Sequence, residues 1–294
     1  DFHISISESE THMTTAITKL QNNVQLTELE LMIMEEAEQE ENAFDMIPTR
    51  LTIAPGGINQ FSTTDGETMK EVMAIVAVSQ KARAYWPGTG SDQAPLCTSA
   101  DGVHGNFAIA PTKTQLTDAV NHRAVHPAIR LYDEQKPFPD YFDCASCPLG
   151  QWDSADKGRG QACKSMRRLV IFVDGWVAPA LLTLPPTSVK VWDIYCSALK
   201  NKRSSYFAVR TKLTLEKAKS AGGDPYSILS VSMAGALTLA ETQAVMELRR
   251  QFAEYVRELP IDASDYVTVD GSTQSQTIDP ETGEIHSDAS QIPF

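Results

Sequence analysis

The sequence lacks several features that would assign it to common protein classes. It has no run of about 18 apolar residues, so no membrane-spanning helix is predicted. No basic segment followed by an apolar stretch marks a secretory signal near its start, and we therefore expect a cytoplasmic protein. The GxxxxGK[ST], GxGxxG, GxSxG and HExxH patterns are also missing, so no catalytic residue is predicted. These absences favour a binding protein over an enzyme.

Lysine and arginine are absent from residues 260–294, which contain seven Asp or Glu residues. Such a polar, acidic segment cannot bury enough apolar surface to offset the entropy lost on ordering, so a disordered tail is expected. Its last three residues, Ile292, Pro293 and Phe294, are apolar instead. An aromatic ring beside a carboxylate suits a partner pocket with an apolar floor and a basic rim.

This ending resembles the C-terminal tip of bacterial single-stranded-DNA-binding proteins, in which an Asp-rich sequence precedes Ile-Pro-Phe. Here Asp288 is the one acid among the five residues before the tripeptide. The resemblance implies a protein that coats single-stranded DNA in a bacterial or phage-infected cytoplasm. It also implies that the tip recruits replication and repair proteins through four residues: Asp288, Ile292, Pro293 and Phe294.

Charge is distributed unevenly along the chain. The formal net charge is −13, which by itself disfavours a nucleic-acid partner. Residues 1–48 hold eleven acids and one base, whereas residues 157–219 hold thirteen bases and three acids. A basic centre between two acidic ends predicts that the central region contacts an anionic partner such as nucleic acid.

The apolar pattern predicts a mainly β protein with flanking helices. Alternating residues predict strands near 50–54, 71–85, 167–173, 176–184, 206–215 and 226–233, with Asp174-Gly175 as a hairpin turn. Helices are expected at 14–42, from Thr187 or Ser188 to about 200, and at 237–259, where Thr238 and Glu241 form a capping box. From residue 71 onward, a helix between the third and fourth of five strands is the order of an OB-fold barrel.

Three regions follow from this pattern. Residues 1–46 form an acidic helical segment, residues 47–259 an OB-fold-like domain, and residues 260–294 the disordered tail. The domain carries an insert at about 87–165 that is rich in Gly, Pro, Asp and Ser. A loop of this length needs something to organise it.

Cysteines within the insert predict a structural zinc site. Cys144 and Cys147 form a CxxC, and Cys97 and Cys163 flank it in loop sequence. Four thiolates can bind Zn²⁺ as a closed tetrahedron that replaces a missing apolar core. His104 is the alternative ligand to Cys97, and Cys196 is expected to be a buried core residue. Disulfides and a thioredoxin-like redox pair remain alternatives that the sequence disfavours.

Single-strand binding requires cations for phosphates and flat side chains on which bases stack. Trp152 has no core-like sequence around it and is the best stacking candidate. Arg210 and Lys212 share one strand face, as do Lys81, Arg83 and Tyr85. The predicted DNA-binding residues are Lys81, Arg83, Tyr85, Trp86, Trp152, Lys164, Arg167, Arg168, Lys202, Arg203, Tyr206, Arg210 and Lys212.

The sequence therefore predicts a single-stranded-DNA-binding protein with a structural Zn²⁺. A zinc-ribbon nucleic-acid enzyme or transcription factor is one alternative, and a protein-binding adaptor is the other. The preference for DNA over RNA and the oligomeric state stay open.

Overall fold

The computed structural model describes residues 48–54, 56–87, 94–118, 124–155, 160–176, 178–220, 223, 225–261 and 265. It also gives two short paired strands, β12 (Thr277–Ile278) and β13 (Ile285–His286). The predicted N-terminal helix and the tip residues Asp288, Ile292, Pro293 and Phe294 lie outside these ranges.

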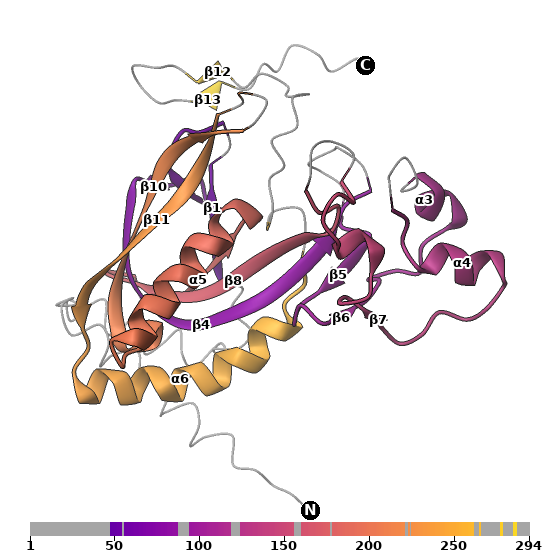
Figure 1. The fold of residues 1–294 in the computed structure, drawn as a ribbon. Helices are drawn as coiled ribbons and strands as arrows, with labels where there is room; N and C mark the ends of the chain where they lie inside the picture. The colour runs from indigo at the N-terminus through magenta and orange to yellow at the C-terminus, as the bar shows by residue number, and fades with distance from the viewer. Residues whose placement is uncertain are drawn as a thin grey trace, which may run out of the picture.

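The protein is mainly β, built on a curled, open sheet that resembles a half-barrel (Figure 1). Its strands are ordered β11-β10-β4-β8-β9-β1-β2-β3, and β5 also pairs with β4. All the pairs are antiparallel except that of β1 with β9. The strands are β1 (Thr49–Ile53), β2 (Phe61–Thr63), β3 (Thr68–Met69), β4 (Glu71–Tyr85), β5 (Cys97–Ser99), β8 (Lys164–Val173), β9 (Ala180–Leu184), β10 (Val209–Lys219) and β11 (Pro225–Ala236).

The expected strands and hairpin are present, but they belong to a larger sheet than a five-stranded barrel. Nine strands take part in the sheet. In the described residues, the neighbours of β9 are β8 and β1, so β9 does not pair with β11. A turn at Asp174-Gly175 begins the connection, and the Gly175 φ of 87° suits a residue without a side chain. The return strand β9 starts at Ala180 and not at residue 176, so the expected two-residue connection is wrong. Residues expected to begin β10 form a short 3-10 turn instead, η2 (Tyr206–Ala208).

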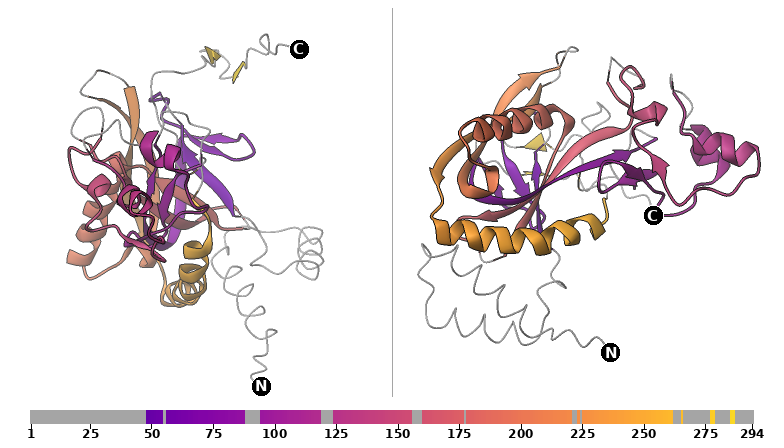
Figure 2. Two further views of the ribbon diagram at one scale, coloured as in Figure 1. Left: turned by 90° about the vertical axis from the view of Figure 1, so that its right-hand side faces the viewer. Right: turned by 60° about the horizontal axis from the view of Figure 1, so that its bottom comes forward.

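Two helices cover the two faces of the sheet. Helix α5 (Pro186–Asn201) lies within the curve, and α6 (Leu239–Glu258) runs along the outer face (Figures 1 and 2). Trp192 and Tyr195 of α5 are buried against the inner face, where the Trp192 Nε1 donates to Ser79 at 2.9 Å. The predicted capping box is confirmed at the start of α6, where Thr238 and Glu241 bond each other's backbone amides.

A bulge in β4 changes which side chains face which layer. Val76 pairs with Ile171 and Val78 with Val170, so Ala77 is an extra residue in the ladder. Before the bulge, even-numbered residues such as Ala74 pack on the inner, α5 side; beyond it, Val78 packs on the α6 side. Since side chains alternate along a strand, Ser79, Lys81, Arg83 and Tyr85 follow on the inner face.

The insert between β4 and β8 projects to one side of the sheet (Figure 1). The insert is not a structureless loop, because it contains short elements of its own. These are β5, β6 (His104–Gly105), α3 (Lys113–Asp118), α4 (Ala128–Asp133), β7 (Phe142–Asp143) and η1 (Pro148–Gly150). Phe107, Phe138 and Phe142 pack edge to face and form a small aromatic core for the outer part.

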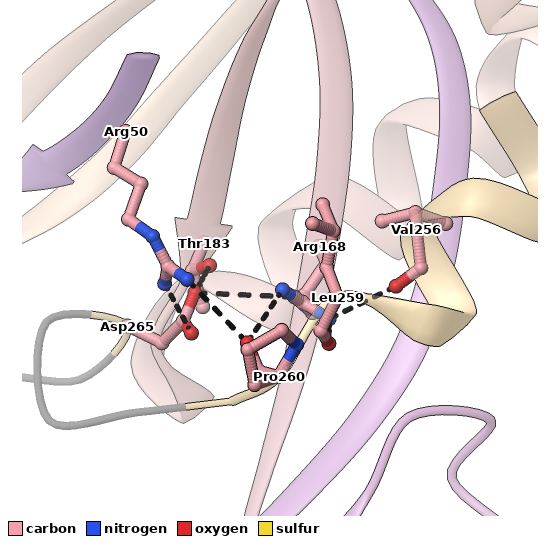
Figure 3. Close-up of polar contacts among 7 residues, drawn as sticks. All are labelled: Arg50, Arg168, Thr183, Val256, Leu259, Pro260 and Asp265. Carbon is pink, nitrogen blue, oxygen red and sulfur yellow. Dashed lines mark hydrogen bonds and ion pairs between the residues drawn. The ribbon is translucent and has the colours of Figure 1, made fainter. Parts of the chain in front are cut away.

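Residues following α6 continue the packed region past the expected boundary at residue 259. Ile261 is buried against Ala82, Ala84 and Met166. Asp265 is buried beside Arg50 and Thr183 on the outer face of β1 and β9 (Figure 3). Ile261 and Asp265 therefore belong to the folded unit, beyond the expected boundary at residue 259.

Candidate nucleic-acid interface and cysteine cluster

The four cysteines of the insert come together from three separate segments. Cys97 opens β5 beside Tyr85, Cys144 and Cys147 flank the turn between β7 and η1, and Cys163 directly precedes β8. All four are buried, and they line one cavity of about 20 Å³ together with Arg83 and His126.

Hydrogen bonds to the Asp143 side chain fix the turn that carries the CxxC. The Asp143 carboxylate accepts from the amides of Ala145 and Ser146 at 3.1 and 3.0 Å. Burial raises the pKa of the Cys147 thiol, whereas hydrogen bonds from the amides of Leu149 and Gly150 lower it. The Gly150 amide also donates to the Cys147 carbonyl oxygen at 3.0 Å, which closes the turn.

Burial sets the protonation of the cluster in the absence of an ion. It raises the pKa of Cys163 to about 12, with a further upward effect from Cys147, while the Arg83 guanidinium acts in the opposite direction. Burial also raises the pKa of Cys97, helped by the three neighbouring thiols. Burial therefore disfavours the thiolate form of each cysteine.

The described residues contain no group of three or more His, Cys, Asp or Glu side chains already arranged as a metal site. The sulfurs share a cavity without forming a closed cage. His104 does not line this cavity; its Nδ1 bonds the Asp101 carboxylate at 2.6 Å and its ring lies against Tyr141. His126 lines it instead, and burial lowers its pKa to about 4. Nothing local in the sequence around His126 signalled this position.

Arg83 was expected to contact phosphate, but its side chain points into the cysteine cluster. Its Nη1 lies 2.7 Å from the Cβ position that a side chain at Gly150 would take. That nitrogen is buried and has no hydrogen-bond partner among the described residues. Tyr85, also predicted to bind DNA, is buried in the same cluster.

Arg168 has a structural position as well, and full burial prevents it from reaching a phosphate. Its guanidinium donates to the carbonyl oxygens of Val256 and Leu259 at 3.0 and 2.9 Å, and to that of Pro260 at 3.2 Å (Figure 3). It thereby holds the carbonyl end of α6, which favours a cation. The neighbouring Arg167 lies on the opposite face and forms two 3.0 Å bonds to Asp193.

The other predicted cations lie at the surface or in surface ion pairs. Lys81, Lys202 and Arg203 are exposed, while Lys164 is half-buried and donates to the Gln161 carbonyl. Arg210 pairs with Asp174 and Glu241, and Lys212 pairs with Glu71. Lys81 lies on β4 and Lys164 on β8, and Arg210 and Lys212 lie on β10, whereas Lys202 and Arg203 follow α5.

Among the predicted stacking residues, Trp152 stands out, with 75% of its surface exposed on the turn after η1. Trp86 is half-buried against Ala82, Ala84 and Met166. Tyr206 is half-buried, lies against Trp192 and carries the Arg249 guanidinium over its ring. Trp152 is therefore the predicted aromatic residue with a face open to a ligand.

No family model, curated protein or solved structure matches this chain. In the described part of the chain, no helix is long and apolar enough to cross a membrane.

Proposed function

We propose that this protein binds single-stranded DNA without sequence specificity and serves DNA replication, recombination or repair without enzymatic activity. The strand order carries the proposal. From β4 onward, five strands of the sheet outside the insert follow one another as β4, β8, β9, β10 and β11, with α5 between the third and fourth. This is the order of an OB-fold, whose common ligands are oligonucleotides. The curl of the sheet supports the same assignment, and the pairing of β1 with β9 departs from it.

Side chains suited to single-strand binding support the proposal at the surface. Trp152 offers an open π-face, and base stacking on such a ring is tolerant of sequence. Arg210 and Lys212 are held by exposed carboxylates, and surface ion pairs contribute only about 0–1 kcal/mol. A phosphate can therefore replace their partners at little cost.

Partner recruitment belongs to the same proposal. In it, the acidic sequence after Asp265 acts as a tether, and Asp288 with Ile292, Pro293 and Phe294 engages replication or repair proteins. The support is the sequence alone, because these residues lie outside the described ranges.

A fluorescence titration with oligo-dT, repeated at several salt concentrations, tests the proposal. Trp192 is buried and Trp86 and Trp176 are half-buried, so most of the quenching by bound bases is expected to arise from exposed Trp152. Trp152→Phe should lose most of the quenching but keep the affinity measured by anisotropy, since a ring remains. Trp152→Ala should weaken binding by about 1–3 kcal/mol.

Ile109→Ala is the matched control, because Ile109 is also an exposed apolar residue of the insert but has no aromatic face. It should bind as the parent does. Absence of oligo-dT binding at low salt would reject the proposal in favour of a protein-binding adaptor. Preference for duplex DNA would indicate a transcription factor, and preference for single-stranded RNA would change the assigned nucleic acid.

A further inference from the structure

We propose that Cys97, Cys144, Cys147 and Cys163 bind one Zn²⁺ ion, and that Arg83 is the buried cation that balances its charge. This inference is independent of the proposed function, because it depends only on the cysteine cluster and its surroundings.

The donors fit zinc in kind and number. All four are sulfurs, and Zn²⁺ forms closed tetrahedral sites with four thiolates. They are brought together from segments up to 66 positions apart, in a cavity of about 20 Å³. A cavity needs about 10–15 Å³ to hold one water-sized particle, so there is room for a single ion after a small contraction of the sulfurs. Four protein ligands leave no position for substrate, which makes the site structural.

Hydrogen-bond donors also lie around the sulfurs. The amides of Leu149 and Gly150 are next to Cys147, and the Ser99 hydroxyl, which donates to the Asp101 carboxylate at 3.0 Å, is next to Cys144. Thiolates on a metal accept hydrogen bonds more strongly than neutral thiols, and such neighbours orient the ligands. Gly105 lies close to the cluster; a side chain there would meet the sulfurs of Cys97 and Cys144 at 3.2 and 3.5 Å.

Arg83 provides the independent observation. Its Nη1 is buried with no hydrogen-bond partner in the described part of the chain, and its guanidinium is close enough to act on Cys144, Cys147 and Cys163. A buried guanidinium nitrogen without a hydrogen-bond acceptor or an anionic partner is unfavourable. Four thiolates around Zn²⁺ have a net charge of −2, which supplies that partner.

The ion also replaces a core that this end of the insert lacks. Apart from the cysteines, the buried residues of the cluster are Tyr85 and Leu149. Metal coordination contributes folding free energy where so little apolar surface is buried. The main sheet has its own two apolar clusters, so its folding does not depend on the ion.

Metal analysis of the freshly purified full chain is the first test. One zinc per chain is expected, and replacement by Co²⁺ should give the intense sulfur-to-cobalt absorption of a four-thiolate site. Cys144→Ser should lose the metal and become sensitive to proteases within residues 94–155. Cys196→Ser is the control, since Cys196 packs against the sheet core, and it should retain the metal.

Arg83→Met tests the charge-balancing role. Chelator competition should show zinc affinity reduced about 10–100-fold, the usual effect of removing a group that supports metal ligands. Arg83→Lys should recover part of that loss because it restores the charge. Arg167→Met is the control, because Arg167 lies on the neighbouring strand β8 and pairs with Asp193. This substitution also removes a cation, and it should leave zinc affinity unchanged.

Two outcomes would overturn the inference. Protein without stoichiometric metal, whose thiols form disulfides or stay freely reactive, would show that the cluster is not a zinc site. If Arg83→Met binds zinc as tightly as the parent, the site stands but Arg83 does not balance it.

Discussion

At the residue scale, Arg167 and Arg168 show how neighbours in a strand acquire different roles. Alternation along β8 places Arg167 toward α5 and Arg168 toward the end of α6. Arg167 forms an ion pair with Asp193, whose side chain is 49% exposed. Arg168 lies beside Asp265, and the side chains of these two residues are 0% and 1% exposed. The sequence alone assigned both arginines to phosphate binding.

Asp265→Asn should strongly destabilise the fold. Asp265 accepts from Arg50 at 2.5 Å and from Thr183 at 2.7 Å, and its Oδ1 lies 3.9 Å from the Arg168 Nε (Figure 3). Removing one member of a buried ion pair costs about 3–5 kcal/mol. Urea unfolding should show this loss, at the lower end because Arg168 keeps its carbonyl partners.

Asp193→Asn provides the matched control for the same chemical change. This substitution breaks the ion pair between Arg167 and the exposed Asp193. It should lower the free energy of unfolding by no more than about 1 kcal/mol. Equal effects of the two substitutions would mean that the interactions of Asp265 contribute no more than a surface pair.

At the element scale, α6 begins with an arrangement that depends on pH. Hydrogen bonds from the Thr238 amide and hydroxyl lower the pKa of Glu241, and Arg210 adds to the effect. The folded state therefore favours the carboxylate. The resulting stabilisation is complete above the pKa of an unfolded glutamate, about 4.3, and is lost as the pH falls through the lower folded value.

Glu241→Gln should reduce the free energy of unfolding by about 0.5–1 kcal/mol at pH 7, because the charge near the helix N-terminus is lost. The difference from the parent should shrink below about pH 4 as Glu241 becomes protonated. Urea midpoints measured from pH 7 to 3 check this. A difference that stays constant with pH would indicate that the charge of Glu241 does not stabilise α6.

At the scale of the whole molecule, the charges of β10 should determine part of the salt dependence of DNA binding. Arg210→Gln with Lys212→Gln should lower affinity and reduce the salt slope by about one for each phosphate that is no longer neutralised. Arg130→Gln is the control, since Arg130 lies on α4 in the insert and pairs with Glu134. An unchanged slope in the double variant would remove β10 from the interface.

Truncation after residue 269 should separate two roles of the tail. Because Ile261 and Asp265 are packed, this end point keeps the fold, whereas removal from residue 260 would not. Loss of an acidic segment that competes with DNA should raise affinity slightly, and mainly at low salt.

Deleting Phe294 alone should leave DNA affinity unchanged but abolish capture of replication or repair proteins from host lysate. Equal capture with and without Phe294 would contradict the role given to the tip.

The sequence by itself determined the local elements of this protein. Alternation predicted β4 at residues 71–85, Asp174-Gly175 predicted the hairpin, and Thr238 with Glu241 predicted the start of α6. Each depends on residues a few positions apart, whose spacing is visible in the sequence. The four cysteines were likewise grouped from spacing and composition.

The tertiary structure alone decided the long-range arrangement. The bulge at Ala77 turned Arg83 toward the cysteines, β1 joined β9 in parallel, and Arg168 bonded a carbonyl 88 positions away. One extra residue in a strand reverses the faces of all that follow, and nothing local distinguishes a phosphate-binding arginine from one that holds a helix end. These choices follow from burial of distant segments against one another, which spacing along the chain does not encode.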